Sequence, residues 1–115
     1  MILAVLDDLL FTSKIKAAAG QLGVAVSFAR SAGAALDAMT ATPPSLVILD
    51  LNNARVDPMG LVAAMKANPA LAAIPTVGFV SHVQTDLIDA ARAAGVTDVM
   101  ARSAFAQRIG EILQR

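Results

Sequence analysis

The sequence predicts an α/β domain in which five strand–helix units, (βα)5, form a doubly wound parallel sheet with helices on both faces. Short apolar segments alternate with longer segments whose apolar residues recur at helical spacing. Residues 46–49 are continuously apolar, which is typical of a strand that is buried on both faces. The hydrophobic content is 57% and much of it is alanine, a helix-forming residue small enough for helices to pack closely on a sheet.

The first two units have clear boundaries. A strand is predicted at residues 2–6, and the helix after it carries apolar residues at i, i+4, i+7 and i+8 counted from Phe11. Gly23 is expected to end this helix in a left-handed conformation. The β-branched residues of segment 24–28 favour a second strand. Ser31 is expected to be the N-cap of the second helix.

The central strand is bounded by residues that stop helices. Pro43 and Pro44 cannot continue a helix, so the apolar run that follows them starts a new element. The run ends at Asp50. Pro58 is expected in the first turn of the third helix, where its missing N–H costs no hydrogen bond, and Asn68 is expected near the end of that helix.

The fourth unit begins after a proline. The segment 76–80 predicts a strand, and Gln84 or Thr85 opens a helix that Gly95 ends. The fifth strand, at 96–101, has the weakest pattern. Ser103 is expected to cap a last helix.

The apolar side of this last helix contains Phe105, Ile109, Ile112 and Leu113. Helices that connect parallel strands make right-handed crossovers and cover both faces of the sheet. Residues 1–115 are therefore predicted to form one domain.

Composition excludes several classes of function. The formal net charge is zero and the sequence has no basic stripe, which argues against direct binding of nucleic acid. The absence of cysteine excludes disulfides and thiolate metal sites. No basic leader and no apolar stretch near ~20 residues is present, so we expect a soluble, cytoplasmic domain without membrane contact. Charged residues are only 16%, which favours a protein partner or a homodimer.

Reactive side chains end four of the five predicted strands, namely Asp7, Asp8, Asp50, Ser81 and Arg102. A flavodoxin-like strand order, 2-1-3-4-5, places the first and third strands side by side and brings the three carboxylates together at the carboxyl edge. Oxygen ligands of this kind suit a hard cation such as Mg²⁺. An aspartate beside such an ion, facing a hydroxyl and a cation, is arranged to receive a phosphoryl group.

Four segments jointly resemble the receiver domain of two-component response regulators, the CheY-like family, over essentially the whole chain. They are Val5–Asp8, Leu46–Asp50, Pro75–Ser81 and Gly95–Arg102. The resemblance implies phosphorelay signal transduction, in which a sensor histidine kinase or a phosphotransfer protein phosphorylates the domain. It implies a receiver that catalyses its own phosphotransfer, rather than an enzyme with a separate substrate. A downstream partner or output domain would bind the face made by the fourth helix, the fifth strand and the last helix.

The resemblance also implies a role for each site residue. Asp50 matches the phosphoacceptor, which becomes a phosphoaspartate. Asp8 matches the direct Mg²⁺ ligand, and Asp7 matches the acid that acts through water. Asn52 matches the residue whose backbone carbonyl binds the ion, and Ser81 matches the switch hydroxyl.

The positions that depart from the family pattern include Arg102, His82 and Val99. Arg102 stands in the place of a lysine, and its planar guanidinium can clamp the phosphoacceptor and the metal-binding aspartate directly, without a metal. His82 takes a position that the family fills with a small residue. Val99 takes that of an aromatic switch residue. Arg102 and His82 both oppose Mg²⁺ binding, so the alternative function is a pseudo-receiver that binds a protein partner independently of phosphorylation.

Simpler interpretations stand beside these roles. Ser81 can cap a helix, His82 can be an exposed loop residue, and Arg102 can pair with any nearby carboxylate. The segment 9–11 is either core packing or an apolar partner surface. A flavodoxin is disfavoured because aromatic residues are 3% of the chain. An aspartyl phosphatase is disfavoured because the adjacent residues of the first acid pair point opposite ways on a strand.

Overall fold

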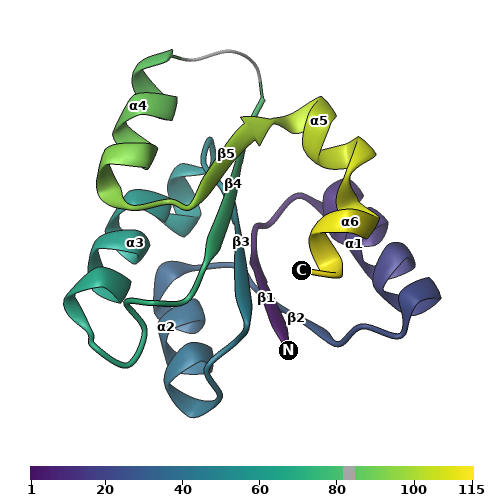
Figure 1. Cartoon of the computed structure of the whole chain (residues 1–115), viewed down its shortest axis with the longest axis horizontal. Helices are drawn as coiled ribbons and strands as arrows, with labels where there is room; N and C mark the ends of the chain where they lie inside the picture. Colours follow the sequence, from purple (N-terminus) through teal and green to yellow (C-terminus); the bar gives the residue numbers. More distant parts are fainter. Residues whose placement is uncertain (82–84) are drawn as a thin grey trace.

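The computed structural model describes residues 1–81 and 85–115, and over these ranges it shows one five-stranded parallel sheet in the order β2-β1-β3-β4-β5 (Figure 1). The strands are β1 (Ile2–Val5), β2 (Val26–Ala29), β3 (Leu46–Asp50), β4 (Thr76–Val80) and β5 (Asp98–Ala101). The helices are α1 (Leu9–Leu22), α2 (Ala32–Ala41), α3 (Pro58–Ala67), α4 (Thr85–Ala94), α5 (Arg102–Gln107) and α6 (Ile109–Leu113), with a 3₁₀ turn η1 (Ala54–Val56). The predicted α/β fold and its flavodoxin-like strand order are confirmed.

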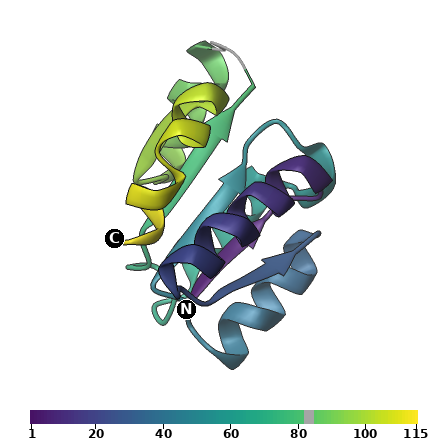
Figure 2. The ribbon, with the colours of Figure 1, turned by 90° about the vertical axis from the view of Figure 1, so that its right-hand side faces the viewer.

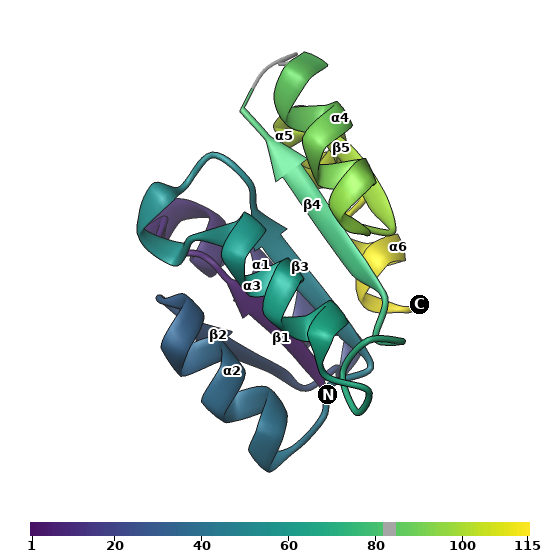
Figure 3. The same cartoon turned by 90° about the vertical axis from the view of Figure 1, so that its left-hand side faces the viewer.

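Helices cover both faces of the sheet. Helices α1, α5 and α6 lie on one face (Figure 2), and α2, α3 and α4 lie on the other (Figure 3). Alternate residues of each strand enter opposite sides of the core. In β3, for example, Ile48 packs in the cluster below α1 and α5, whereas Val47 and Leu49 pack in the cluster below α2 and α3. This double burial explains why the strand is continuously apolar.

Most of the predicted helix ends are confirmed. The Ser31 hydroxyl accepts a hydrogen bond from the N–H of Ala34 at 3.1 Å and caps α2. Gly23 adopts φ 68° after α1, and Gly95 adopts φ 106° after α4. Pro58 is the first residue of α3. These residues stop or start each helix where the local chemistry predicts.

Two strands begin later than predicted, and both corrections have the same cause. The strand expected at 24–28 spans 26–29, and the strand expected at 96–101 spans 98–101. The N–H of Val24 donates to Ala19 O and that of Val96 donates to Ala91 O, both at 3.0 Å. Each of these valines therefore closes the preceding helix instead of joining the sheet.

The last helix also differs from its prediction. Its first residue is Arg102 and its N-cap is Ala101, which makes no side-chain capping bond, so Ser103 is not the cap. The helix is interrupted at Arg108, which separates α5 from α6. The N–H of Arg108 is shared between the carbonyls of Ala104 and Phe105, both at 3.1 Å, a tightening that commonly ends a helix.

A close contact positions the loop that follows β3. A Cβ built on Gly78 of β4 would lie 2.6 Å from Cδ1 of Leu51. Glycine at this position therefore lets Leu51, which directly follows Asp50, pack against β4. Within the described ranges, no helix has both the length and the apolar character needed to cross a membrane.

Candidate functional site

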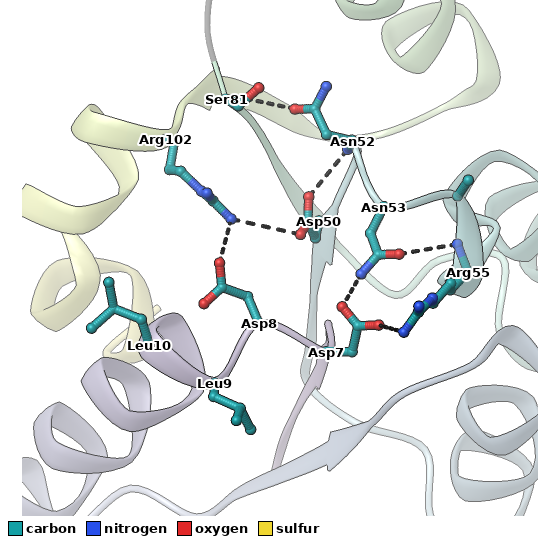
Figure 4. A pocket seen from close by; sticks show the side chains of 11 residues that line it. Asp7, Asp8, Leu9, Leu10, Asp50, Asn52, Asn53, Arg55, Ser81 and Arg102 are labelled. Carbon is teal, nitrogen blue, oxygen red and sulfur yellow. Dashed lines mark hydrogen bonds and ion pairs between the residues drawn. The ribbon is translucent and has the colours of Figure 1, made fainter.

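The strand ends form an acidic pocket at the carboxyl edge of the sheet (Figure 4). This cavity measures about 750 Å³. Strands β1 and β3 are neighbours in the sheet, as the predicted order requires, so the aspartates that follow them share one depression. The pocket is lined by Asp7, Asp8, Leu9, Leu10, Asp50, Asn52, Asn53, Ala54, Arg55, Ser81 and Arg102.

Asp50 is the most deeply placed acid of the acidic pocket. It is the last residue of β3 and is 5% exposed. Its Oδ1 accepts a hydrogen bond from the N–H of Asn52 at 3.1 Å, and its Oδ2 lies 3.8 Å from Nη2 of Arg102. Burial raises the pKa of Asp50 above its ordinary value, although the Asn52 N–H and the Arg102 charge oppose this rise. The carboxylate is thus oriented at one oxygen and faces a cation at the other.

Asp8 has a structural partner and a site partner. Its Oδ1 accepts from the N–H of Phe11 at 3.1 Å, which makes Asp8 the N-cap of α1. Its Oδ2 accepts from Nη2 of Arg102 at 2.9 Å. The Phe11 N–H first, and the Arg102 charge after it, hold the pKa of Asp8 below its ordinary value despite partial burial. Asp8 is therefore an ionised carboxylate held by two donors.

Arg102 links Asp8 to Asp50 and rests on aromatic rings. Its Cζ lies 4.4 Å from the ring centroid of Phe11 and 5.7 Å from that of Phe79. These two rings stack on one another at 5.4 Å. The Arg102 Nε is buried and has no hydrogen-bond partner among the described residues. Cation–π contact and burial thus fix the guanidinium from below while its outer nitrogen faces the two carboxylates.

Asp7 belongs to a separate group on the other side of the acidic pocket (Figure 4). The side-chain amide of Asn53 donates to Oδ1 of Asp7, and Nη1 of Arg55 lies 3.6 Å from its Oδ2. The Arg55 side chain is 84% exposed, so this ion pair is weak. The three predicted acids therefore divide into an Asp8–Arg102–Asp50 group and an Asp7–Asn53–Arg55 group.

The loops after β3 and β4 are joined by a side chain. The Oδ1 atom of Asn52 accepts from the N–H of Ser81 at 2.5 Å. Ser81 lines the pocket from the end of β4, as predicted. His82, which takes the place of a small residue in the family pattern, lies outside the described residues.

The donor set, as arranged, does not fit a divalent metal ion. Each oxygen of Asp7, Asp8 and Asp50 already faces an N–H donor or a guanidinium. Within residues 1–81 and 85–115, no group of three or more His, Cys, Asp or Glu side chains could hold an ion. The predicted ligands Asp7, Asp8, Asp50 and the Asn52 carbonyl thus share a pocket without forming an ion-binding group.

Four further residues shape the site and were not assigned to it from sequence: Phe11, Asn53, Arg55 and Phe79. The position of Phe11, three residues after Asp8 and in the first turn of a helix, is the signal that could have placed its ring near the carboxyl edge. The segment 9–11 divides between the core and the protein surface. Phe11 is 6% exposed and packs in the core, whereas Leu9 and Leu10 are 68% and 63% exposed beside the pocket.

No protein-family model and no curated protein sequence matches the chain. Solved structures do match it. The phosphorylated cyanobacterial phytochrome response regulator RcpA is similar with a TM-score of 0.83 and 24% identity, over 98% of this chain and 87% of that one. The receiver domain of NtrX from Brucella abortus is similar with a TM-score of 0.83 and 24% identity, over 100% of this chain and 96% of that one.

The Mn²⁺-bound form of response regulator Rcp1 is also similar, with a TM-score of 0.83 and 21% identity, over 96% of this chain and 89% of that one. These likenesses extend over nearly the full length of each pair of chains. The strand order and the placement of the helices are those of this fold. The chain has the CheY-like fold of response regulator receiver domains.

Proposed function

We propose that the chain is a cytoplasmic receiver of two-component signalling, in which Asp50 accepts a phosphoryl group from a phosphohistidine of a sensor kinase or phosphotransfer protein. The observation that carries this proposal is the geometry of Asp50. One oxygen is oriented by the Asn52 N–H, and the other faces the Arg102 guanidinium across an open pocket. The fold shared with RcpA, whose structure is of a phosphorylated form, supports the same conclusion.

The transfer is a displacement at phosphorus. A carboxylate oxygen of Asp50 attacks and forms an acyl phosphate, while the bond from phosphorus to the donor imidazole nitrogen breaks. The electron pair of that bond stays on the nitrogen, and the donor leaves as neutral imidazole because its other ring nitrogen carries a proton. Arg102 offsets the negative charge on the phosphoryl oxygens. Ser81, at the end of β4, supplies the switch hydroxyl.

The response would be transmitted by the face made by α4, β5 and α5 to a downstream protein, an output domain or a second copy of the chain. Ser81 directly follows β4, and Arg102 directly follows β5. Both residues that would sense the phosphoryl group are thus attached to elements of this face or to its neighbouring strand. The chain itself would catalyse the transfer and act on no separate substrate.

A small-molecule phosphodonor tests the proposal. After incubation with acetyl phosphate, intact-mass spectrometry should show one added phosphoryl group that hydroxylamine removes. The adduct should be absent from Asp50→Asn. Asp37→Asn is the matched control, because Asp37 is an exposed acid on α2 away from the acidic pocket, and it should retain the adduct. An adduct that persists in Asp50→Asn would contradict the assignment of the acceptor.

The Arg102 bridge also favours a second function, that of a pseudo-receiver. Asp8 and Asp50 are already neutralised in part by Arg102 without any ligand. Such a domain would bind its protein partner in one constant state. It would form no adduct, and the amide chemical shifts of Asp50 and Ser81 would not respond to phosphodonor. A phosphate-dependent shift at Ser81 would exclude it.

A further inference from the structure

We infer that the guanidinium of Arg102 is the resident cation of the acidic pocket and occupies the position that a divalent metal ion would need. Asp8 and Asp50 are then bridged and partly neutralised by a side chain of the protein itself. The inference is that Arg102 supplies the positive charge between these two carboxylates and fills the volume between them. It holds whether or not Asp50 is phosphorylated.

The geometry between the two carboxylates carries the first step. Nη2 of Arg102 lies 2.9 Å from Oδ2 of Asp8 and 3.8 Å from Oδ2 of Asp50. An Mg²⁺ ion bound by both acids would sit about 2.1 Å from each ligating oxygen, between the same two atoms. The ion and the guanidinium nitrogen therefore compete for one space. Metal binding requires that Arg102 leave.

The remaining oxygens of the two carboxylates already accept backbone hydrogen bonds. Oδ1 of Asp8 is used by the N–H of Phe11, which holds the start of α1, and Oδ1 of Asp50 is used by the N–H of Asn52. Asp7 points to the other side of the pocket (Figure 4). A bidentate ion at Asp8 or Asp50 would thus have to share an oxygen with a backbone N–H that already orients it.

The core holds Arg102 in place. The guanidinium lies over Phe11, and the ring of Phe79 beneath it stacks on Phe105 at 4.7 Å. Only 32% of the Arg102 side chain is exposed. An arginine does not lose its proton in proteins, so this charge is permanent. A chelator, which would remove a bound metal ion, therefore leaves this positive charge in the pocket, and so does a change in pH over the ordinary range.

The test is a metal titration of the intact chain. Mg²⁺ is added to ¹⁵N-labelled protein and the amides of Asp8, Asp50 and Asn52 are followed, with Mn²⁺ line broadening of the same amides as a second measurement. The parent should show no saturable response at millimolar Mg²⁺. Arg102→Met, which keeps an apolar chain over the rings, should bind at least about tenfold more tightly.

Two further variants keep the result interpretable. Arg55→Met removes the same charge from the same pocket, on the Asp7 side, and should gain much less affinity for Mg²⁺ than Arg102→Met. Arg102→Lys keeps a positive charge but removes the planar guanidinium that lies between Asp8 and Asp50. It is used in place of Arg102→Met if the spectrum of Arg102→Met differs from that of the parent in regions away from the pocket. Saturable Mg²⁺ binding by the parent within about threefold of the Arg102 variant used overturns the inference. So does an equal gain in Arg55→Met.

Phosphorylation measured with and without Mg²⁺ distinguishes failure of this inference from failure of the proposed function. If Asp50 accepts phosphate, the adduct should form at the same rate in EDTA as in Mg²⁺. A requirement for Mg²⁺ in the parent would overturn the inference and leave the proposed function standing. No adduct under either condition would remove the proposed function, and the metal titration would still decide the inference.

Discussion

Arg102 and Arg55 approach the acidic pocket from opposite sides, and each faces an aspartate that follows β1. Arg102 lies 2.9 Å from Asp8, is 32% exposed and rests on an aromatic ring. Arg55 lies 3.6 Å from Asp7 and is 84% exposed. An arginine–aspartate pair therefore packs on an aromatic ring on one side of the pocket, whereas on the other side a pair of the same kind is exposed to solvent. The comparison teaches that packing around an ion pair, rather than the pair itself, decides its energetic weight.

The largest difference between the two sides should appear when each arginine is removed. Arg102→Ala leaves the buried Asp50 without its cation and uncovers Phe11, so the free energy of unfolding should fall by about 2–4 kcal/mol. Arg55→Ala should lower it by less than about 0.5 kcal/mol. Urea denaturation of both variants measures the difference. Equal losses would show that the aromatic support has no effect.

The aspartates allow a second test of the same asymmetry. Asp8→Ala removes the N-cap of α1 as well as the ion pair and should lower the free energy of unfolding by about 1–2 kcal/mol. Asp8→Asn retains a capping oxygen and isolates the loss of charge. Asp7→Ala should cost less than either, because its partners lie at the pocket surface. A loss at Asp7 as large as at Asp8 would contradict the division of the pocket.

The pH dependence of stability should have opposite signs at the two acids that Arg102 bridges. The lowered pKa of Asp8 stabilises the fold above the ordinary aspartate pKa, and this contribution is lost as pH falls through the folded value. The raised pKa of Asp50 favours the fold at low pH, and this contribution is lost as pH rises through the folded value.

Substitution by asparagine isolates these contributions. Asp50→Asn should be more stable than the parent near pH 7, with the difference shrinking toward about pH 3, below the ordinary aspartate pKa. Asp8→Asn should be less stable near pH 7, and its deficit should also shrink on acidification. Urea denaturation across this range checks both. Differences that do not vary with pH would refute the assigned pKa directions.

The smallest effect is expected at the apolar side chains beside the pocket. Leu9 and Leu10 are exposed in the first turn of α1. Leu9→Ser and Leu10→Ser should each change the free energy of unfolding by no more than about 0.5 kcal/mol. Thermal melts followed by circular dichroism measure this. A larger loss would show that these residues are part of the core.

The overall fold was predictable because its signals are local and repeated. Continuous apolar strands, the Ser31 cap and the terminal glycines were interpreted correctly from neighbouring residues alone, whereas Ser103 was not, and the strand order follows from the (βα)5 pattern. The position of Asp50 at the carboxyl edge followed directly. By contrast, the late starts of β2 and β5 depend on the partner of one valine N–H. It can donate to a carbonyl of the preceding helix or to a neighbouring strand, and the local sequence permits either.

The internal arrangement of the acidic pocket was only partly predictable. That Arg102 can clamp Asp8 and Asp50 followed from its place in the chain and from guanidinium geometry. The pairing of Asp7 with Asn53 and Arg55 did not, because it depends on how the loop after β3 turns through η1. The contact of Arg102 with Phe11 also requires side-chain positions from elements far apart in the sequence.

The two oxygens of Asp8 connect the site to the order in which the chain folds. One oxygen binds the N–H of a residue three positions away, and the other binds a residue 94 positions away. The short-range bond can form as soon as α1 forms, whereas the long-range bond needs the last strand–helix unit in place. The loss in Arg102→Ala should therefore appear as faster unfolding, with the refolding rate nearly unchanged in stopped-flow experiments. The contact between Arg102 and Asp8 would then form late in folding and would mainly set the unfolding rate of the native domain.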